Sequence, residues 1–136
     1  MQTQGFKKQE RLCSKKSIDI LFEEGLSFYV NPLKVKWKNE EFNLIFPAKV
    51  LIVVPKRYFK KAVFRNKIKR QIREAYRKNK NILIDCLLVQ QKSVSIAVIY
   101  TGKDISTYNT IENKIILILQ RLKQLQENSL KPISAK

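Results

Sequence analysis

The residues with the clearest chemistry are the cations between positions 65 and 77, a stretch without glycine or proline to interrupt a helix. At roughly 100° per residue, one face of such a helix gathers the apolar side chains Ile68, Ile72, Ala75 and Tyr76. An adjoining arc of about 140° gathers Arg65, Asn66, Lys69, Arg70, Arg73 and Arg77. The pattern predicts a helix with one face for a protein core and another face for an anionic partner.

No catalytic arrangement that needs histidine is available, because the chain contains none. Three scattered glycines exclude a glycine-rich phosphate loop. The two cysteines, Cys13 and Cys86, lack a metal-ligand spacing and are expected to stay reduced, with Cys86 filling space in the core. The acidic pairs at 23–24 and 40–41 are sequence neighbours, which usually point apart, so no metal site is expected in the protein. These residues indicate a protein that holds nucleic acid and does not cleave it alone.

The composition indicates one folded domain with an anionic partner. Its 136 residues fit a single domain over 1–136, with an ordered core at about 10–126 and basic or polar tails. With 28 Lys and Arg against 11 Asp and Glu, the net charge is +17. Nucleic acid explains that charge best; an anionic membrane surface and simple solubility are the weaker alternatives. We see no signal peptide and no apolar run long enough to span a bilayer, so a cytoplasmic protein without a membrane partner is expected.

The stretch before residue 26 predicts a first helix behind a basic lead-in. The lead-in carries Arg11, Lys15 and Lys16, after which Ser17 can cap a helix that ends at Gly25. Within it, one side gathers Ile18, Leu21 and Phe22. These three side chains fit a core, whereas Phe22 or Ile18 at its rim would offer a surface on which a base can stack.

The middle of the chain reads as strands. Residues 32–38 alternate, with Leu33, Val35 and Trp37 on one face and Lys34, Lys36 and Lys38 on the other. That lysine face fits solvent, protection of a sheet edge, or contact with phosphates. Residues 50–54 read as a strand buried on both faces, and residues 42–46 as a short strand or a loop.

The turn at 56–61 places cations around two aromatic rings, a mixture that suits phosphates and bases together. Either ring, Tyr58 or Phe59, fits core packing equally well. Residues 94–100 predict a last strand, and Thr107 is the expected cap of a final helix to about residue 125. Residues 81–91 are left open as helix or loop. The order helix, three strands, helix, strand, helix predicts an α+β sandwich, a small mixed sheet of about four strands packed with three helices.

Residues 65–74, which read Arg-Asn-Lys-Ile-Lys-Arg-Gln-Ile-Arg-Glu, closely resemble the arginine-rich signature helix of the bacterial ribonuclease P protein family. The core of that motif is Arg-Asn-Arg-x-x-Arg. Residues 11–25 look like the family's first helix, residues 55–57 are similar to its Ser-Lys-Lys turn, and residues 94–122 look like its closing strand and helix. The resemblance runs in register over most of the chain and leaves out residues 42–47 and the tails.

The resemblance implies a sandwich in which the signature helix joins the sheet through a left-handed crossover. It implies a protein that binds a catalytic RNA and the 5′ leader of precursor tRNA, while the RNA removes the leader with Mg²⁺. The partners would then be that RNA and precursor tRNA, with no further protein required. The residues implied to contact the RNA are Arg65, Asn66, Lys67, Lys69, Arg70, Arg73 and, by its place on the arc, Arg77. The alternative is a general structured-RNA-binding or ribosomal-type protein without a role in tRNA processing.

By the same resemblance, the leader would enter a cleft between the sheet and the first helix. The side chains expected to meet it are Phe22, Ile18, Lys36, Trp37, Lys56, Arg57 and Tyr58. The sequence departs from the family pattern in two places within these surfaces. Lys67 replaces the second arginine of the motif and lies off the basic arc, and Ile18 replaces one of two aromatic rings, so stacking would fall to Phe22 or to Trp37, Tyr58 or Phe59.

Overall fold

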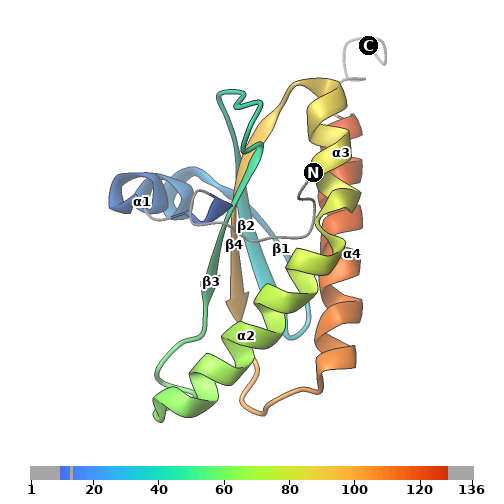
Figure 1. Ribbon diagram of the computed structural model, residues 1–136. Helices are drawn as coiled ribbons and strands as arrows, with labels where there is room; N and C mark the ends of the chain where they lie inside the picture. Colours follow the sequence, from blue (N-terminus) through green and yellow to red (C-terminus); the bar gives the residue numbers. More distant parts are fainter. Residues whose placement is uncertain (1–9, 13, 129–136) are drawn as a thin grey trace.

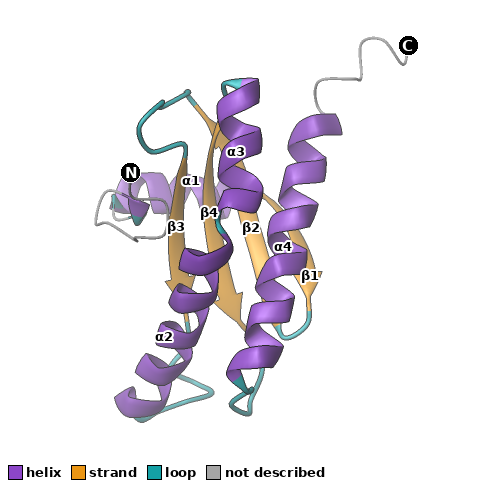
Figure 2. Cartoon of the chain, turned by 45° about the vertical axis from the view of Figure 1, so that its right-hand side comes forward, coloured by secondary structure: helices purple, strands orange, loops and turns teal. Residues whose placement is uncertain are grey.

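The computed structural model describes residues 10–12 and 14–128. Three helices lie on one side of a four-stranded sheet and one helix lies on the other (Figures 1 and 2). The elements are α1 Lys15–Glu24, β1 Leu26–Val30, β2 Leu33–Glu40, β3 Ala48–Val53, α2 Ala62–Asn79, α3 Asn81–Gln90, β4 Ser93–Tyr100 and α4 Tyr108–Asn128. This is the predicted α+β sandwich, with one helix more than expected. The predicted tails fall almost entirely outside the described residues.

The sheet has the order β1-β2-β4-β3 and mixes both kinds of pairing, as predicted. β2 pairs antiparallel with β1 and with β4, whereas β3 and β4 are parallel. A parallel pair needs a crossover, and α2 and α3 supply it. The first strand, β1, was not expected from the sequence, and β2 runs two residues beyond the predicted strand.

The main core lies between the sheet and helices α2, α3 and α4. The four residues assigned to the apolar face of α2 are its buried residues, which confirms the helical-wheel prediction. Alternate residues of β2, namely Leu33, Val35 and Trp37, are buried in the same cluster. A smaller cluster of Leu12, Leu21 and Ala97 lies on the opposite face, beneath α1.

Residues 81–90 form a separate helix because α2 ends at Asn79. The Asn79 side chain donates to the carbonyl oxygen of Ala75 at 2.8 Å and to Oε2 of Glu112 at 3.0 Å. Such a bond competes with the backbone ladder and holds α2 against α4. Cys86 lies in α3 as a buried free thiol, as expected. None of the helices in the described part of the chain combines the length and apolarity that crossing a bilayer requires.

The predicted helix caps are right in one case and wrong in the other. Thr107 caps α4, since its Oγ1 accepts from the backbone N–H of Thr110 at 3.3 Å. α1 begins earlier than predicted, and its cap is Ser14, which accepts from the N–H of Ser17 at 3.3 Å. Ser14 satisfies a free N–H group of the first turn, so Ser17 lies inside the helix.

Residues 41–47 form a loop and not a strand. Asn43 organises it: its Oδ1 accepts from the N–H groups of Ile45 and Phe46, both at 3.0 Å. The N–H of Asn43 donates to Oγ of Ser93 at 2.7 Å, which attaches the loop to β4. The apolar side chains of Leu44 and Ile45 remain exposed at its tip.

Gly25, at the end of α1, allows a close approach of two backbones. A Cβ atom there would lie 2.5 Å from the carbonyl oxygen of Leu21 and 3.0 Å from that of Trp37. Because both atoms belong to the backbone, they cannot move aside. We expect Gly25→Ala to lower the free energy of unfolding by about 1–3 kcal/mol, measured by urea denaturation. Ser27→Ala, at an exposed site two residues on, should stay within about 0.5 kcal/mol of wild type. Equal stability of both variants would contradict the close packing at Gly25.

Candidate nucleic-acid interface

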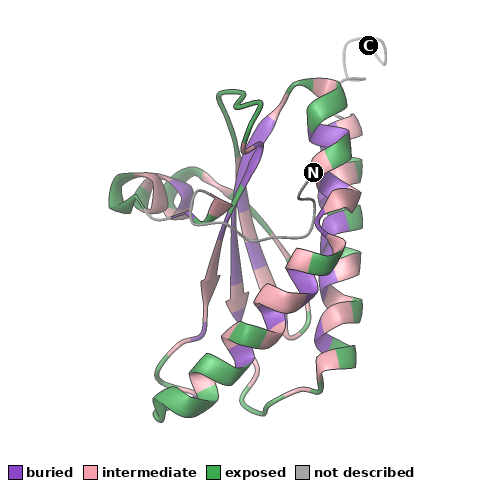
Figure 3. Ribbon diagram, in the orientation of Figure 1, coloured by how far each residue is buried: buried purple, intermediate pink, exposed green. Residues whose placement is uncertain are grey.

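The side of α2 that faces away from the core is largely exposed or half-buried (Figure 3), and most of its side chains there are polar or cationic. Asn66, Lys67 and Arg70 are exposed, and Lys69 and Arg73 are half-buried. No acidic residue lies in the first turn, and no side chain caps the helix. The positive end of the helix dipole therefore adds to the cations and does not neutralise them, which favours an anion at this end.

Arg65 differs from the other predicted cations because it bonds the protein. Its Nη1 donates to the carbonyl oxygens of Phe59 and Lys60, both at 2.7 Å. These bonds fix the turn that enters α2. Arg65 thus sets where the helix starts as well as adding charge to its first turn.

Arg77, at the far end of the arc, is paired with Glu74. Its Nε and Nη2 donate to the two carboxylate oxygens at 3.1 and 2.6 Å. The hydrogen bond from Arg77 lowers the pKa of Glu74 below its ordinary value, so the carboxylate stays ionised at neutral pH. Within the predicted arc, Glu74 therefore offsets the charge of Arg77. Among the described residues, no ion pair involves Lys69, Arg70 or Arg73.

The opposite face of the sheet carries the second predicted surface. Phe22 and Ile18 of α1 pack against the Leu12–Leu21–Ala97 cluster and remain partly exposed, whereas Leu21 is fully buried. This arrangement favours the rim position for the Phe22 ring, with Leu21 as the core residue of the helix. A ring at the rim can accept a base on its open face.

The lysines of β2 lie on this same face. Lys36 Nζ donates to the carbonyl oxygen of Phe22 at 3.1 Å, which ties the last turn of α1 to the sheet. Lys34 and Lys38 flank it on alternate positions, opposite to the buried Val35 and Trp37. Because β2 lies between β1 and β4, protection of a sheet edge is excluded as the reason for these lysines. They lie on the face of the sheet on which α1 packs.

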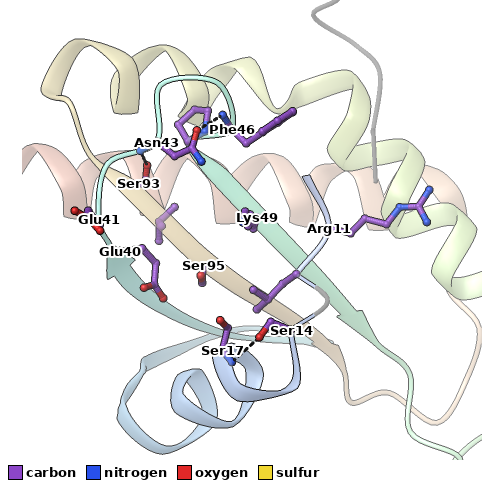
Figure 4. A pocket seen from close by; sticks show the side chains of 13 residues that line it. Arg11, Ser14, Ser17, Glu40, Glu41, Asn43, Phe46, Lys49, Ser93 and Ser95 are labelled. Carbon is purple, nitrogen blue, oxygen red and sulfur yellow. Dashed lines mark hydrogen bonds between the residues drawn. The ribbon is translucent and has the colours of Figure 1, made fainter. Parts of the chain in front are cut away.

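A hollow of about 640 Å³ lies on this face, between the start of α1 and the 41–47 loop (Figure 4). Glu40 and Glu41 approach it from the end of β2, while Arg11 extends away from them on the other side. Its lining also includes Lys49, Asn43 and four serines, Ser14, Ser17, Ser93 and Ser95. The sequence reasoning missed these polar residues. Lys49 could have indicated this hollow from the sequence, because it is the one charged residue among the apolar residues of β3. Its side chain lies on the face turned away from the main core.

The other four predicted leader contacts lie away from the face beside α1. Trp37 is 7% exposed within the main core, so the prediction that it meets a leader is wrong: its ring lies on the other face of the sheet from Phe22. Tyr58 packs against the main core and lies under Arg57, whose guanidinium carbon is 5.0 Å from the ring centroid. Lys56 and Arg57 stay exposed in the turn after β3.

The basic lead-in lies at the surface, with Arg11, Lys15 and Lys16 all exposed. Lys15 and Lys16 occupy the first turn of α1, where the helix dipole disfavours positive charge and where no acid is present. Their charges are therefore not offset within the first turn of the helix. Arg11 bridges to Val50 and so lies at the β3 edge.

Comparison with known proteins places the chain in a family. The sequence model described as Ribonuclease P matches residues 6–123. The chain belongs to the ribonuclease P family. A ribonuclease P protein component from Porphyromonas gingivalis strain W83 is 35% identical over 120 residues, which cover 88% of each chain. One from Thermotoga sp. strain RQ2 is 30% identical over 128 residues, covering 88% of this chain and 97% of the relative.

Solved ribonuclease P proteins share the fold. The RNase P protein from Thermotoga maritima superposes with a TM-score of 0.67 at 27% identity, covering 82% of this chain and 96% of that chain. A mutant RNase P protein from Staphylococcus aureus gives a TM-score of 0.68 at 27% identity, covering 85% and 90%. The sandwich and the order of its elements are therefore those of the family.

The Glu74–Arg77 pair yields a prediction for the affinity between this chain and RNA. Glu74→Gln removes a negative charge from α2 beside Arg77, so binding to a bacterial ribonuclease P RNA should tighten. The log–log slope of affinity against salt should steepen by about 0.7–0.9, the value for one further phosphate. Folding should be spared, since an exposed pair is worth only about 0.2–1 kcal/mol. Filter binding at a series of salt concentrations measures both quantities.

Two variants bracket this result. Glu127→Gln removes the same charge near the end of α4, beside α3, and should leave the slope unchanged. Arg70→Ala removes an exposed cation of the arc and should flatten the slope by the same amount that Glu74→Gln steepens it. An unchanged slope for Glu74→Gln would contradict the statement that Glu74 offsets Arg77.

Proposed function

We propose that this protein is the protein subunit of ribonuclease P and assists removal of the 5′ leader from precursor tRNA in the cytoplasm. The observation that carries the proposal is the build of α2. Its apolar face is buried in the core, its cations stay at the surface, and the chain belongs to the ribonuclease P family. In this proposal the cations of α2 bind the catalytic RNA, and no further protein is needed.

The face beside α1 receives the leader in this proposal. Phosphates of the single strand contact Lys34, Lys36 and Lys49, while one base stacks on the half-exposed ring of Phe22. Stacking on a ring and charge contacts to phosphates tolerate any sequence. A subunit that serves many different precursors needs this tolerance.

The chemistry of cleavage belongs to the RNA in this proposal. Mg²⁺ prefers carboxylate oxygens, phosphates and water. Within residues 10–12 and 14–128, no three His, Cys, Asp or Glu side chains lie together in a group able to hold a metal ion. We assign the ion to the RNA and its substrate, whose phosphates and bound water are ligands that Mg²⁺ prefers. The protein binds and positions the two RNA molecules.

Reconstitution tests the proposal. The full chain is mixed with a bacterial ribonuclease P RNA, and cleavage of precursor tRNA is followed at low Mg²⁺. We expect the chain to stimulate leader removal, because its charge offsets phosphate repulsion that Mg²⁺ would otherwise screen. Absence of stimulation would reject the function. A general RNA-binding protein, the alternative, would bind precursor and mature tRNA equally well in the presence of the ribonuclease P RNA.

The proposed leader surface makes a separate prediction. Phe22→Ala should leave assembly with the RNA unchanged and weaken binding of precursor tRNA by about 5- to 150-fold, the loss expected for one stacked base. Binding of mature tRNA, which has no leader, should not change. Fluorescence titration of the assembled holoenzyme with each tRNA measures the difference.

Phe28→Ala is the matched control for this variant. Phe28 is also half-buried, but it packs against the main core on the other face of the sheet. It should cost stability without affecting discrimination between the two tRNAs. Equal losses for precursor and mature tRNA with Phe22→Ala would instead assign that ring a purely structural role.

A further inference from the structure

A second hollow lies at the start of α2, away from the α1 face. It has a volume of about 470 Å³ and is formed between the turn that enters α2 and the loop that joins β4 to α4. The two loops come together at the same end of the sandwich (Figure 1). Its lining consists of Tyr58, Phe59, Lys60, Lys61, Phe64, Lys103, Asp104 and Ile105. The size lies within the range of about 300–1,000 Å³ that is usual for small-molecule sites.

Both walls of this hollow are held in place by buried or half-buried groups. On one side, Arg65 Nη1 bonds the carbonyl oxygens of Phe59 and Lys60 at 2.7 Å. On the other side, the buried Tyr100 hydroxyl bonds the carbonyl oxygen of Asp104 and lies 3.1 Å from Oγ of Ser106. Gln71 of α2 adds a bond to the carbonyl oxygen of Ser106 at 3.2 Å. The shape is therefore present before any ligand arrives.

The floor of the hollow is aromatic and buried. Phe59 is 8% exposed and packs on Tyr100, with ring centroids 5.9 Å apart and a tilt of 57°. At the rim, the large apolar side chains stay open to solvent: Phe64 is 42% exposed and Ile105 is 36% exposed. An exposed ring and an exposed isoleucine facing one hollow are suited to an apolar, flat ligand.

The rim also carries an excess of positive charge. Lys60, Lys61 and Lys103 are exposed around the hollow, against a single acid, Asp104. The N-terminus of α2 opens here, and no side chain caps it. Uncapped N–H groups and three ammonium groups favour a phosphate at the rim, while the ring and the isoleucine favour a base within it.

We propose that this hollow binds one unpaired nucleotide of the partner RNA, with its base against Phe64 and Ile105 and its phosphate on the lysines. This inference rests on the proposed function, since that function supplies the RNA. A nucleotide fits the mixture of ring, aliphatic wall and cations better than an acidic peptide, which offers no flat apolar face. Lys67 lies one turn beyond Phe64 on the exposed side of α2, so the hollow continues the charged surface of that helix. The site is distinct from the α1 face, because Tyr58 and Phe59 belong to the main core and not to the cluster beneath α1.

The test uses the full chain and a bacterial ribonuclease P RNA. Phe64→Ala should weaken association by about 5- to 150-fold with an unchanged salt slope, because it removes stacking and no charge. Phe64→Trp, which keeps a ring, should restore most of the affinity. Lys103→Gln should flatten the salt slope by about 0.7–0.9, the value for one phosphate contact. Chemical probing of the RNA should show an unpaired nucleotide that wild-type protein protects and Phe64→Ala protein leaves reactive.

The control is Phe42→Ala, which removes a phenylalanine of similar exposure, 36%, from the 41–47 loop. Its affinity should match wild type, and circular dichroism should show that both variants fold. If the wild-type chain fails to bind the RNA or to stimulate cleavage, the proposed function itself falls. If the wild-type chain stimulates cleavage while Phe64→Ala binds as tightly as Phe42→Ala, the nucleotide site alone is rejected. A loss of affinity that Phe64→Trp does not restore, or one without any change in RNA protection, would also reject it.

Discussion

Helix α2 is anchored at both ends by cations that bond the protein itself. At its start Arg65 holds two carbonyl oxygens, and just past its end Lys80 pairs with Glu10 at 2.6 Å in an almost buried position. Removing one partner of a buried pair leaves an uncompensated charge, at a cost of about 3–5 kcal/mol. Between these anchors, four apolar residues press the helix onto the sheet and α4. These contacts hold the helix in one position and orientation. Its remaining cations therefore present a defined pattern to a partner.

The two charged surfaces make unfavourable electrostatic contributions to the stability of the folded chain. A net charge of +17 repels itself in the folded state, and Lys15 and Lys16 oppose the dipole of α1. The uncapped start of α2 likewise forgoes a stabilising hydrogen bond. These unfavourable features lie on the surfaces that we propose bind RNA. Bound RNA would therefore stabilise the folded chain. The same residues thus lower the stability of the free protein and favour the binding of an anion.

Periodicity was sufficient for α1, α2 and α4, but not for α3 or for deciding which side chains share a face of the sheet. The apolar stripe of α2 repeats over three turns, so its buried residues could be assigned from the sequence. The cap at Thr107 could be assigned as well, from its residue type and position. The alternation in β2 separated Trp37 from the lysines correctly, yet it could not show that Phe22 shares a face with the lysines and not with Trp37. β1 was not predicted because a strand of five residues is too short to show a clear alternation of apolar and polar side chains. The hollows at Lys49 and at Phe64 each join segments far apart in sequence, which no local pattern can reveal.

The short segment at residues 10–12 protects an outer edge of the sheet. Leu12 donates its N–H to the carbonyl oxygen of Val50 at 3.0 Å, and Arg11 bridges to the same residue, so this segment covers part of the outer edge of β3. An open edge offers unpaired hydrogen-bonding groups to any other strand in solution. The same few residues also supply Glu10, the counter-charge of Lys80. Removing residues 10–12 would therefore uncover hydrogen-bonding groups at the edge of β3 and take away the carboxylate that pairs with Lys80. This short segment thus supports the sheet and the end of α2 as well as leading into α1.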